Sequence, residues 1–348
     1  MLCSRSVNCC HFCLSAQRHW VVLTSLMVLL ATPADGLSAE YRDGQSVTYH
    51  GYPDCIVLRN ASTQVVLCPE AGGRVLEFSR NNVNALYLEE ADTGKPYVRG
   101  SRASMSAGRF DIGPEKTIPK HSVLWSGRWK GEVTGPRRAR LTSQKDDATG
   151  VRLIREFELA EQGSYLQCSQ TIVNVSQMTN QWCHWSRTFA VGEGICVIPL
   201  SPPSRFPNNY VMYQTGTLID INPTDANIRT RDGFLEILAA PAHPKLGMDS
   251  TRGWFAYLMP NDLMFVKRFQ VDPNRVYNEA AGLTISIWYP PGKRVELEPI
   301  GPRETLRPGE AASFTEHWYL LDYDFPRDRN NVALKQVANC VERGTKTP

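Results

Sequence analysis

The feature that most constrains the fold is an alternation of short apolar runs with turn residues, which begins near residue 47 and continues towards the C-terminus. Between residues 151 and 159 the apolar side chains fall on alternate positions, at Val151, Leu153, Phe157 and Leu159. A period of two is typical of a strand with one buried face. Polar and glycine-containing segments at 146–150 and 161–164 are turn candidates on either side. This part of the chain is therefore predicted to be antiparallel β structure.

Similar runs recur through most of the remaining chain. Further strands are expected over residues 165–175, 234–239, 254–258, 264–269, 283–288, 295–297 and 313–321. Loops rich in proline and glycine, such as 199–207 and 290–292, lie between them. Only residues 331–341 suggest a short helix. Many strands, few helices and no evident linker or repeat predict an all-β protein, with a large antiparallel sandwich in one domain.

The charge pattern gives no electrostatic reason to propose a nucleic-acid partner. The 348 residues carry a formal net charge of +3, and basic and acidic residues are mixed along the sequence. The densest basic cluster, at residues 137–140, adjoins a predicted turn, so we interpret it as a solvated face.

The N-terminus is predicted to be a signal peptide. Residues 20–31 read WVVLTSLMVLLA, which is shorter than the roughly 20 apolar residues that a membrane span needs. Leu37-Ser38-Ala39 fits a cleavage site that follows small residues. We therefore expect a signal peptide at 1–39 and a mature domain at 40–348. The protein would be secreted, or located in the periplasm or cell envelope, with no stable membrane span after cleavage. An uncleaved signal anchor is the alternative.

Six cysteines remain beyond residue 39, and one pair of them is suggested by register. Cys55 and Cys68 are equidistant from a turn candidate at 60–63, so a tight hairpin would place them directly opposite each other. An exported chain permits a disulfide here but does not require one. A bridge and two buried thiols both remain open.

Four segments, taken in order, carry a resemblance to a known superfamily. They are Pro69–Phe78 with its Gly-Gly pair; Ile118–His121; Gln170–Ser176 followed by His184; and Val295–Pro299 followed by Leu306–Glu310. Together they resemble the galactose-mutarotase-like superfamily of sugar-binding proteins, whose aldose 1-epimerases have a Gly-Gly hairpin, two functional histidines, a strand ending in N-x-S and a glutamate strand closed by an L-x-P-G-E turn. The resemblance implies a large antiparallel β-supersandwich of the galactose-mutarotase type that binds a mono- or oligosaccharide. No H-x-H or H-E-x-x-H spacing supports a metal site, and we expect no cofactor.

The resemblance also implies roles for three residues. Glu298 would be the base, His184 the acid, and His121 would bind a hydroxyl or share the acid role. Interconversion of aldose anomers requires removal of the proton from the anomeric hydroxyl and protonation of the ring oxygen, so it needs such a pair on opposite sides of one pyranose. The alternative for His184, which stands between Cys183 and Trp185, is a hydrogen-bonded core residue.

Aromatic and polar residues near these segments are candidates for binding a sugar. Flat indole rings suit the apolar C–H faces of sugars, while charged side chains bond the hydroxyls; for each tryptophan the alternative is a place in the core. The candidates are Arg74, Arg109, Asp111, Trp125, Arg128, Trp185 and Trp254.

Three functions remain open at this point. The first is sugar binding with epimerase activity, the second is a non-catalytic sugar-recognition protein of the cell envelope, and the third is an enzyme related to polysaccharide lyases or hydrolases. The segments around His184 and after Glu298 depart from the epimerase pattern. These departures favour the second function over the first.

Overall fold

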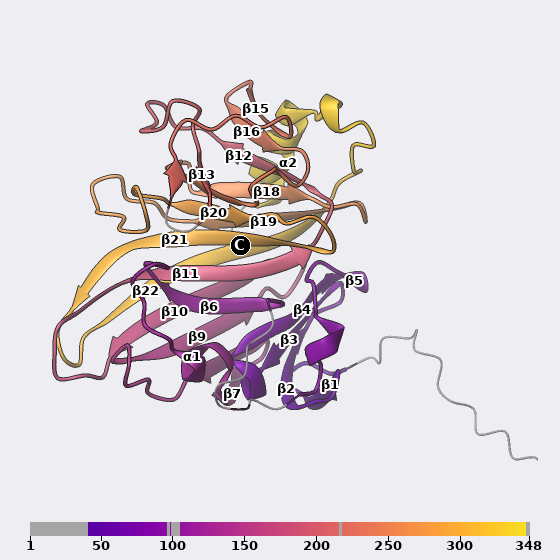
Figure 1. The fold of residues 1–348 in the computed structure, drawn as a ribbon. Helices are drawn as coiled ribbons and strands as arrows, with labels where there is room; N and C mark the ends of the chain where they lie inside the picture. Colours follow the sequence, from indigo (N-terminus) through magenta and orange to yellow (C-terminus); the bar gives the residue numbers. More distant parts are fainter. Residues whose placement is uncertain (1–40, 96–97, 99–104, 216–217, 346–348) are drawn as a thin grey trace, which may run out of the picture. The chain divides into compact units, whose positions relative to one another are not determined.

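Two antiparallel sheets build the protein (Figure 1). The computed structural model describes residues 41–95, 98, 105–215 and 218–345. These residues fall in one compact unit. The predicted signal peptide, residues 1–39, lies outside the described residues.

The larger sheet has twelve strands in the order β1-β2-β3-β4-β6-β11-β21-β20-β17-β13-β14, with β5 paired to β4. Their bounds are β1 (Ser46–Tyr49), β2 (Tyr52–Arg59), β3 (Thr63–Cys68), β4 (Arg74–Arg80), β5 (Val83–Asn84), β6 (Gly108–Gly113), β11 (Asn180–Val191), β13 (Val211–Tyr213), β14 (Ile219–Asp220), β17 (Lys245–Met248), β20 (Ile285–Trp288) and β21 (Arg294–Leu306).

The smaller sheet has ten strands in the order β15-β16-β12-β18-β19-β22-β10-β9-β8-β7. Their bounds are β7 (Lys130–Gly135), β8 (Arg138–Thr142), β9 (Val151–Leu159), β10 (Leu166–Asn174), β12 (Ile195–Pro199), β15 (Ile228–Arg231), β16 (Phe234–Ile237), β18 (Trp254–Leu258), β19 (Leu263–Phe269) and β22 (Ala311–Asp322).

Short helical segments connect these strands. They are α1 (Ser122–Ser126), α2 (Leu334–Gly344) and the 3₁₀ turns η1 (Pro69–Ala71), η2 (Glu90–Asp92) and η3 (Arg329–Asn331). Within the described ranges, neither helix combines the length and apolarity needed to cross a bilayer.

The core lies between the two sheets. Phe78 of the larger sheet contacts Phe265 of the smaller one, with ring centroids 5.7 Å apart, and both pack against Trp318. The apolar residues of β9 alternate with exposed ones as expected, since Val151 and Leu153 are buried and Arg152 is exposed. Burial of such side chains is worth about 25 cal/mol for each Å² removed from water. The predicted all-β sandwich is confirmed.

Several strands differ from the sequence-based prediction, and two of them, β21 and β11, carry residues of the site. The strand expected at 295–297 is β21, which continues to Leu306 through two prolines, with Pro299 opposite Ile285. The central strand β11 was not predicted at all. Its polar residues point to both faces of the sheet, since Ser186 contacts the buried Lys267 of the smaller sheet while Arg187 points outward. That arrangement removes the alternation by which a strand with one buried face is recognised.

The predicted Gly-Gly hairpin is present between β3 and β4. Gly72 and Gly73 have positive φ angles of 74° and 58°. A Cβ atom at Gly73 would lie 2.5 Å from the ring of Trp129. Glycine is required here because the turn is left-handed and the indole fills the space that a side chain would need.

The hairpin of β2 and β3 places Cys55 and Cys68 as the sequence predicted. Ile56 lies opposite Leu67, so the next residues along the two strands, Cys55 and Cys68, also face each other. The Asn60 amide donates to the Thr63 carbonyl at 3.0 Å. Hydrogen-bonded and non-hydrogen-bonded pairs alternate along an antiparallel pair of strands, and the two cysteines lie five positions from this bonded pair. They therefore form a non-hydrogen-bonded pair, for which a Cα separation of about 4.5 Å is typical. A disulfide accommodates that separation, although the structure holds two buried free thiols.

We predict that oxidised glutathione joins Cys55 to Cys68 by thiol–disulfide exchange. Peptide mapping without reduction should find the two cysteines linked, and the unfolding free energy should rise by up to about 3 kcal/mol. Cys196, which is also buried, serves as a control and should stay reduced. Recovery of both thiols in alkylated form after oxidation and unfolding would contradict the prediction.

Candidate functional site

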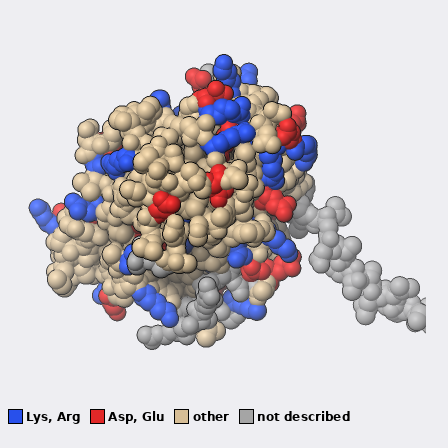
Figure 2. Space-filling view, turned by 45° about the horizontal axis from the view of Figure 1, so that its top comes forward, with Lys and Arg blue, Asp and Glu red and all other residues tan. Residues whose placement is uncertain are grey.

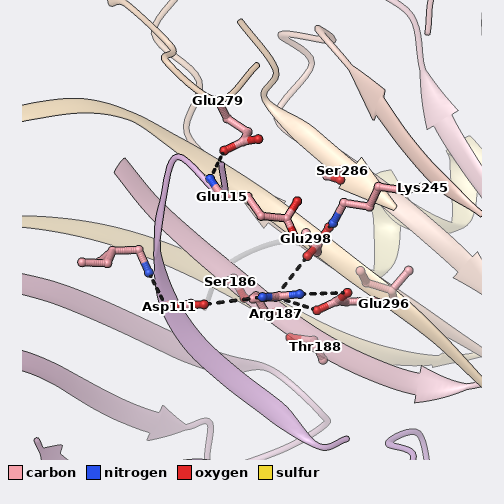
Figure 3. A network of polar contacts seen from close by, with 12 residues as sticks. Asp111, Glu115, Ser186, Arg187, Thr188, Lys245, Glu279, Ser286, Glu296 and Glu298 are labelled. Carbon is pink, nitrogen blue, oxygen red and sulfur yellow. Dashed lines mark hydrogen bonds and ion pairs between the residues drawn. The ribbon is translucent and has the colours of Figure 1, made fainter. Parts of the chain in front are cut away.

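Charged side chains form a cluster on the outer face of the larger sheet, away from the core (Figure 3). Successive residues of a strand point to opposite faces. Leu297 of β21 belongs to the core between the sheets, so Glu296 and Glu298 on either side of it point outward. On β20, Ile287 faces the core and Ser286 lies on the same outer side as Glu298.

Arg187 of β11 is the centre of this cluster. Its Nε lies 2.7 Å from Glu296 Oε1 and 3.3 Å from Glu298 Oε1. Its Nη1 lies 3.5 Å from Asp111 Oδ2 on the other side. Only 12% of the side chain is exposed. Figure 3 shows the guanidinium between Asp111 and Glu296, with Glu298 adjacent.

Lys245 of β17 supplies the second cation. Its Nζ donates to Glu298 Oε2, and Glu298 itself is fully buried. The Lys245 ammonium also lies 5.0 Å from the centre of the Trp185 ring. Glu298 is therefore neutralised from two sides, by Lys245 and by Arg187.

The two glutamates of β21 differ in protonation. Burial raises the pKa of Glu296 to about 7, and the nearby Glu298 carboxylate adds to the rise against the effect of Arg187. Burial also acts on Glu298, but Lys245 and Arg187 hold the pKa of that carboxyl below its ordinary value. Near neutral pH the pair therefore shares one exchangeable proton, held mainly by Glu296.

Asp111 of β6 joins the cluster to His121, which precedes α1. His121 Nε2 lies 2.7 Å from Asp111 Oδ1, and His121 Nδ1 lies 2.7 Å from the Pro119 carbonyl. Both partners only accept, so both ring nitrogens donate and the ring is an imidazolium. Burial disfavours that charge, but the Asp111 carboxylate outweighs it and raises the pKa of His121 to about 9.

Aromatic rings make cation–π contacts with the arginines of the cluster. The Arg187 guanidinium carbon lies 4.9 Å from the Trp125 ring centre and 5.3 Å from that of Trp185. Arg109 lies over Trp125 at 4.3 Å and donates to the Trp125 carbonyl. These stacked contacts hold the guanidinium groups in place and limit their access to water.

A further acidic pair lies beside Lys245. Glu279 is buried and accepts from the Glu115 backbone amide at 2.8 Å and from the Tyr213 hydroxyl at 3.3 Å. Burial raises the pKa of Glu279 to about 7. Among the described residues, no group of three or more His, Cys, Asp or Glu side chains is placed to hold a metal ion.

Two hollows open beside Arg187. The first, which we name the Trp288 pocket, has a volume of about 400 Å³. Its lining includes Glu115, Lys116, Tyr213, His243, Lys245, Trp288 and Glu296. The second, the His121 pocket, has a volume of about 350 Å³. Its lining includes Asp111, Ile118, Lys120, His121, Ser122 and Trp125. Arg187 and Met105 line both.

The structure brings several of the predicted site residues together. Those in the cluster are Arg109, Asp111, His121, Trp125, Trp185 and Glu298. Glu298 lies beneath the Trp288 pocket and does not line it, whereas Glu296 does. The glutamate that a ligand in this pocket would contact is therefore two residues earlier than the one expected.

His184 lies on the other face of the sheet, so the structure does not bring it to Glu298. Its ring is stacked between Phe110 and Phe314, and its Nε2 donates to the Ala312 carbonyl at 3.0 Å. Burial lowers its pKa to about 4, so the ring is neutral at neutral pH. This placement is the core alternative considered for this residue. The residue of β11 that faces the pockets is Arg187.

Three other predicted binding residues lie away from the pockets. Arg74 is buried, bonded to the Ala71 carbonyl and stacked over Tyr52. Arg128 is two-thirds exposed and pairs with Glu70 at 2.6 Å. Trp254, on β18 of the smaller sheet, packs on Phe234.

Sequence reasoning missed Arg187, Lys245 and Glu296. A signal for Glu296 was present, because a charged–apolar–charged triplet inside the apolar run VELEPI indicates that one face of the strand is polar. Lys245 stands in a short segment without such a pattern, and only the strand order of the sheet brings it to Glu298.

Neither protein-family models nor curated proteins match the sequence. Solved structures do match. A galactose mutarotase-like protein from Lactobacillus casei aligns with 77% of this chain and 100% of its own, at 11% identity and a TM-score of 0.53. A galactose mutarotase related enzyme from Lactobacillus acidophilus covers 77% and 98%, at 10% identity and a TM-score of 0.55. The chain has the galactose-mutarotase-like fold.

A third solved structure also matches the chain. The Slr1438 protein from Synechocystis sp. PCC 6803 aligns with 82% of this chain and 100% of its own, at 16% identity and a TM-score of 0.53. The expected fold class is thus confirmed. Identities this low speak for the mutarotase-like fold alone, so the function has to be argued from the site itself.

We predict that Arg187→Met destabilises the protein by about 3–5 kcal/mol at pH 7, because three buried carboxylates lose their shared cation. Urea unfolding measures this loss. Arg138→Met, in the exposed pair with Glu158, is the matched control and should leave the unfolding free energy nearly unchanged. The loss for Arg187→Met should shrink at pH 5, where Glu296 is protonated. Equal losses for the two variants would contradict the prediction.

We also predict that His121 titrates with a midpoint near pH 9 in NMR spectra. Its pKa is raised above the ordinary 6.5, so its stabilising contribution is complete below about pH 6.5 and is lost as the pH rises through about 9. Asp111→Asn should move the midpoint down. His317 has a lowered pKa and serves as a control that titrates on the acid side. A His121 midpoint near 6.5 in the unaltered protein would contradict the assignment.

Proposed function

We propose that the chain is an exported carbohydrate-binding protein that holds a saccharide against Arg187 on the outer face of the larger sheet. The observation that carries the proposal is the Trp288 pocket, in which fixed charges converge beside an aromatic wall. Export is inferred from the leader-like residues 1–39.

The side chains in this pocket suit a sugar. Each hydroxyl group of a sugar both donates and accepts, so it can bond to a cation and a carboxylate at once. Arg187 and Lys245 donate and Glu296 accepts, and each is already held by the charge network. Because these groups are positioned before the ligand arrives, little ordering free energy is lost on binding. Trp288 and Pro244 provide an apolar wall for the C–H face.

Arg187 supports binding over epimerisation. An epimerase needs an acid that gives up a proton to the ring oxygen. Burial works against the charge of Arg187, but Glu296, Glu298 and Asp111 outweigh it and raise its pKa above its ordinary value. A guanidinium of this kind keeps its proton at working pH, so it can bond the sugar but cannot act as the acid.

Epimerase chemistry is the second candidate, and two groups favour it. Glu296, with a pKa of about 7, would be the base, and the His121 imidazolium, with a pKa of about 9, would be the acid. They line adjoining pockets on either side of Arg187. A role for the protein as a lyase or hydrolase gains no specific support from these contacts.

The test uses protein recovered from the export compartment, with an N-terminus at Glu40 expected on sequencing. NMR follows freshly dissolved α-glucose and α-galactose. We expect ligand signals to broaden on binding, with no faster exchange of anomers. Glu296→Gln should weaken binding by at least about tenfold, and Glu156→Gln, in an exposed pair with Arg140, should not. Faster exchange that Glu296→Gln abolishes would favour the epimerase instead.

A further inference from the structure

The two pockets share a boundary. Arg187 and Met105 belong to the lining of both, so the Trp288 pocket and the His121 pocket meet at these two side chains. Each has an aromatic residue of its own, Trp288 in one and Trp125 in the other. The site therefore offers two adjoining places for rings, with the guanidinium between them.

The two pockets differ in charge. In the Trp288 pocket, three cations, Lys116, Arg187 and Lys245, face two carboxyl groups, those of Glu115 and Glu296. The Glu298 carboxylate beneath the pocket also pairs with Lys245, so the Trp288 pocket has little excess positive charge.

The His121 pocket is more basic. The cations Lys120, His121 and Arg187 face a single carboxylate, that of Asp111. Asp111 is itself bonded to His121 and paired with Arg187, and only 5% of its side chain is exposed. A ligand entering here meets an excess of positive charge, since the one anion is buried behind its partners.

From these observations we infer that the ligand is an acidic oligosaccharide of at least two units, which lies across Arg187. A neutral unit occupies the Trp288 pocket, and a unit with a carboxylate occupies the His121 pocket near Lys120. This inference rests on the proposed function and specifies its ligand class. A monosaccharide fills only one of the two pockets, whereas a disaccharide contacts both and leaves the shared guanidinium bonded to either unit or to the bridging oxygen.

Titration calorimetry of the mature protein tests the proposed ligand class by measuring the affinity for four sugars. They are galactose, galacturonic acid, galactobiose, and a disaccharide of galactose and galacturonic acid. We expect the acidic disaccharide to bind at least about tenfold more tightly than either monosaccharide and than galactobiose. Its affinity should fall with added salt, because the charges involved are near the surface. Lys120→Ala should reduce the preference for the acidic disaccharide.

The outcomes separate this inference from the proposed function. Equal affinities for galactose and for both disaccharides would overturn the inference and leave sugar binding intact. If both disaccharides bind more tightly than galactose but with equal affinity to each other, the inference that one sugar unit carries a carboxylate is overturned. If none of the four probes binds, the proposed function fails and the inference fails with it.

A blocking variant tests the shared boundary directly. Met105→Trp places a bulky ring where the pockets meet, so it should abolish the gain from the second sugar unit, measured as the ratio of disaccharide affinity to monosaccharide affinity. Met178→Trp is the matched control, because Met178 is 76% exposed and lines neither pocket. A disaccharide affinity unchanged by Met105→Trp would show that the ligand does not cross this boundary.

Discussion

The guanidinium of Arg187 is the interaction on which the outer face of the larger sheet depends. Removing a charge from water costs several kcal/mol, and this cost is offset only where partners are close and well oriented. Asp111 on β6 and the two glutamates on β21 supply those partners from the strands on either side of β11. A slip of one residue in either strand would turn these carboxylates into the core, so the ion pairs and the strand register require each other.

The inner face of β11 carries a second polar anchor. Lys267 of β19 is fully buried between the sheets and lies 2.9 Å from Glu316 on β22. It also donates to Thr188 at 2.7 Å and to Ser186 at 3.1 Å. On its inner face, β11 is therefore tied to the smaller sheet by Lys267 of β19. On its outer face, its own Arg187 organises the two pockets. The mutarotase-like fold here is held by charge as well as by apolar packing.

Figure 2 shows that basic and acidic residues are mixed over the face of the molecule in that view. A ligand at Arg187 would therefore meet a local arrangement of charge and not a broad electrostatic field. Around Arg187 the acids are buried and paired, while Lys116 and Lys120 are exposed. Sugars with an acidic group suit such an arrangement, since a ligand contacts the exposed charges first and the buried pairs keep their geometry.

The sequence by itself determined the all-β class, many of the strands and the facing positions of Cys55 and Cys68, because these follow from local periodicity and turn chemistry. The Gly-Gly turn followed from the resemblance to the mutarotase-like superfamily. It also pointed to Asp111, His121 and Glu298. Only the tertiary structure decided which side chains share the site. Each strand has two faces, and local sequence does not say which face of β11 is turned towards the other sheet. In the tertiary structure Arg187 lies on the outer face beside the pockets, and His184 lies on the inner face in the core. Those choices depend on contacts between residues far apart in the chain, which local patterns do not record.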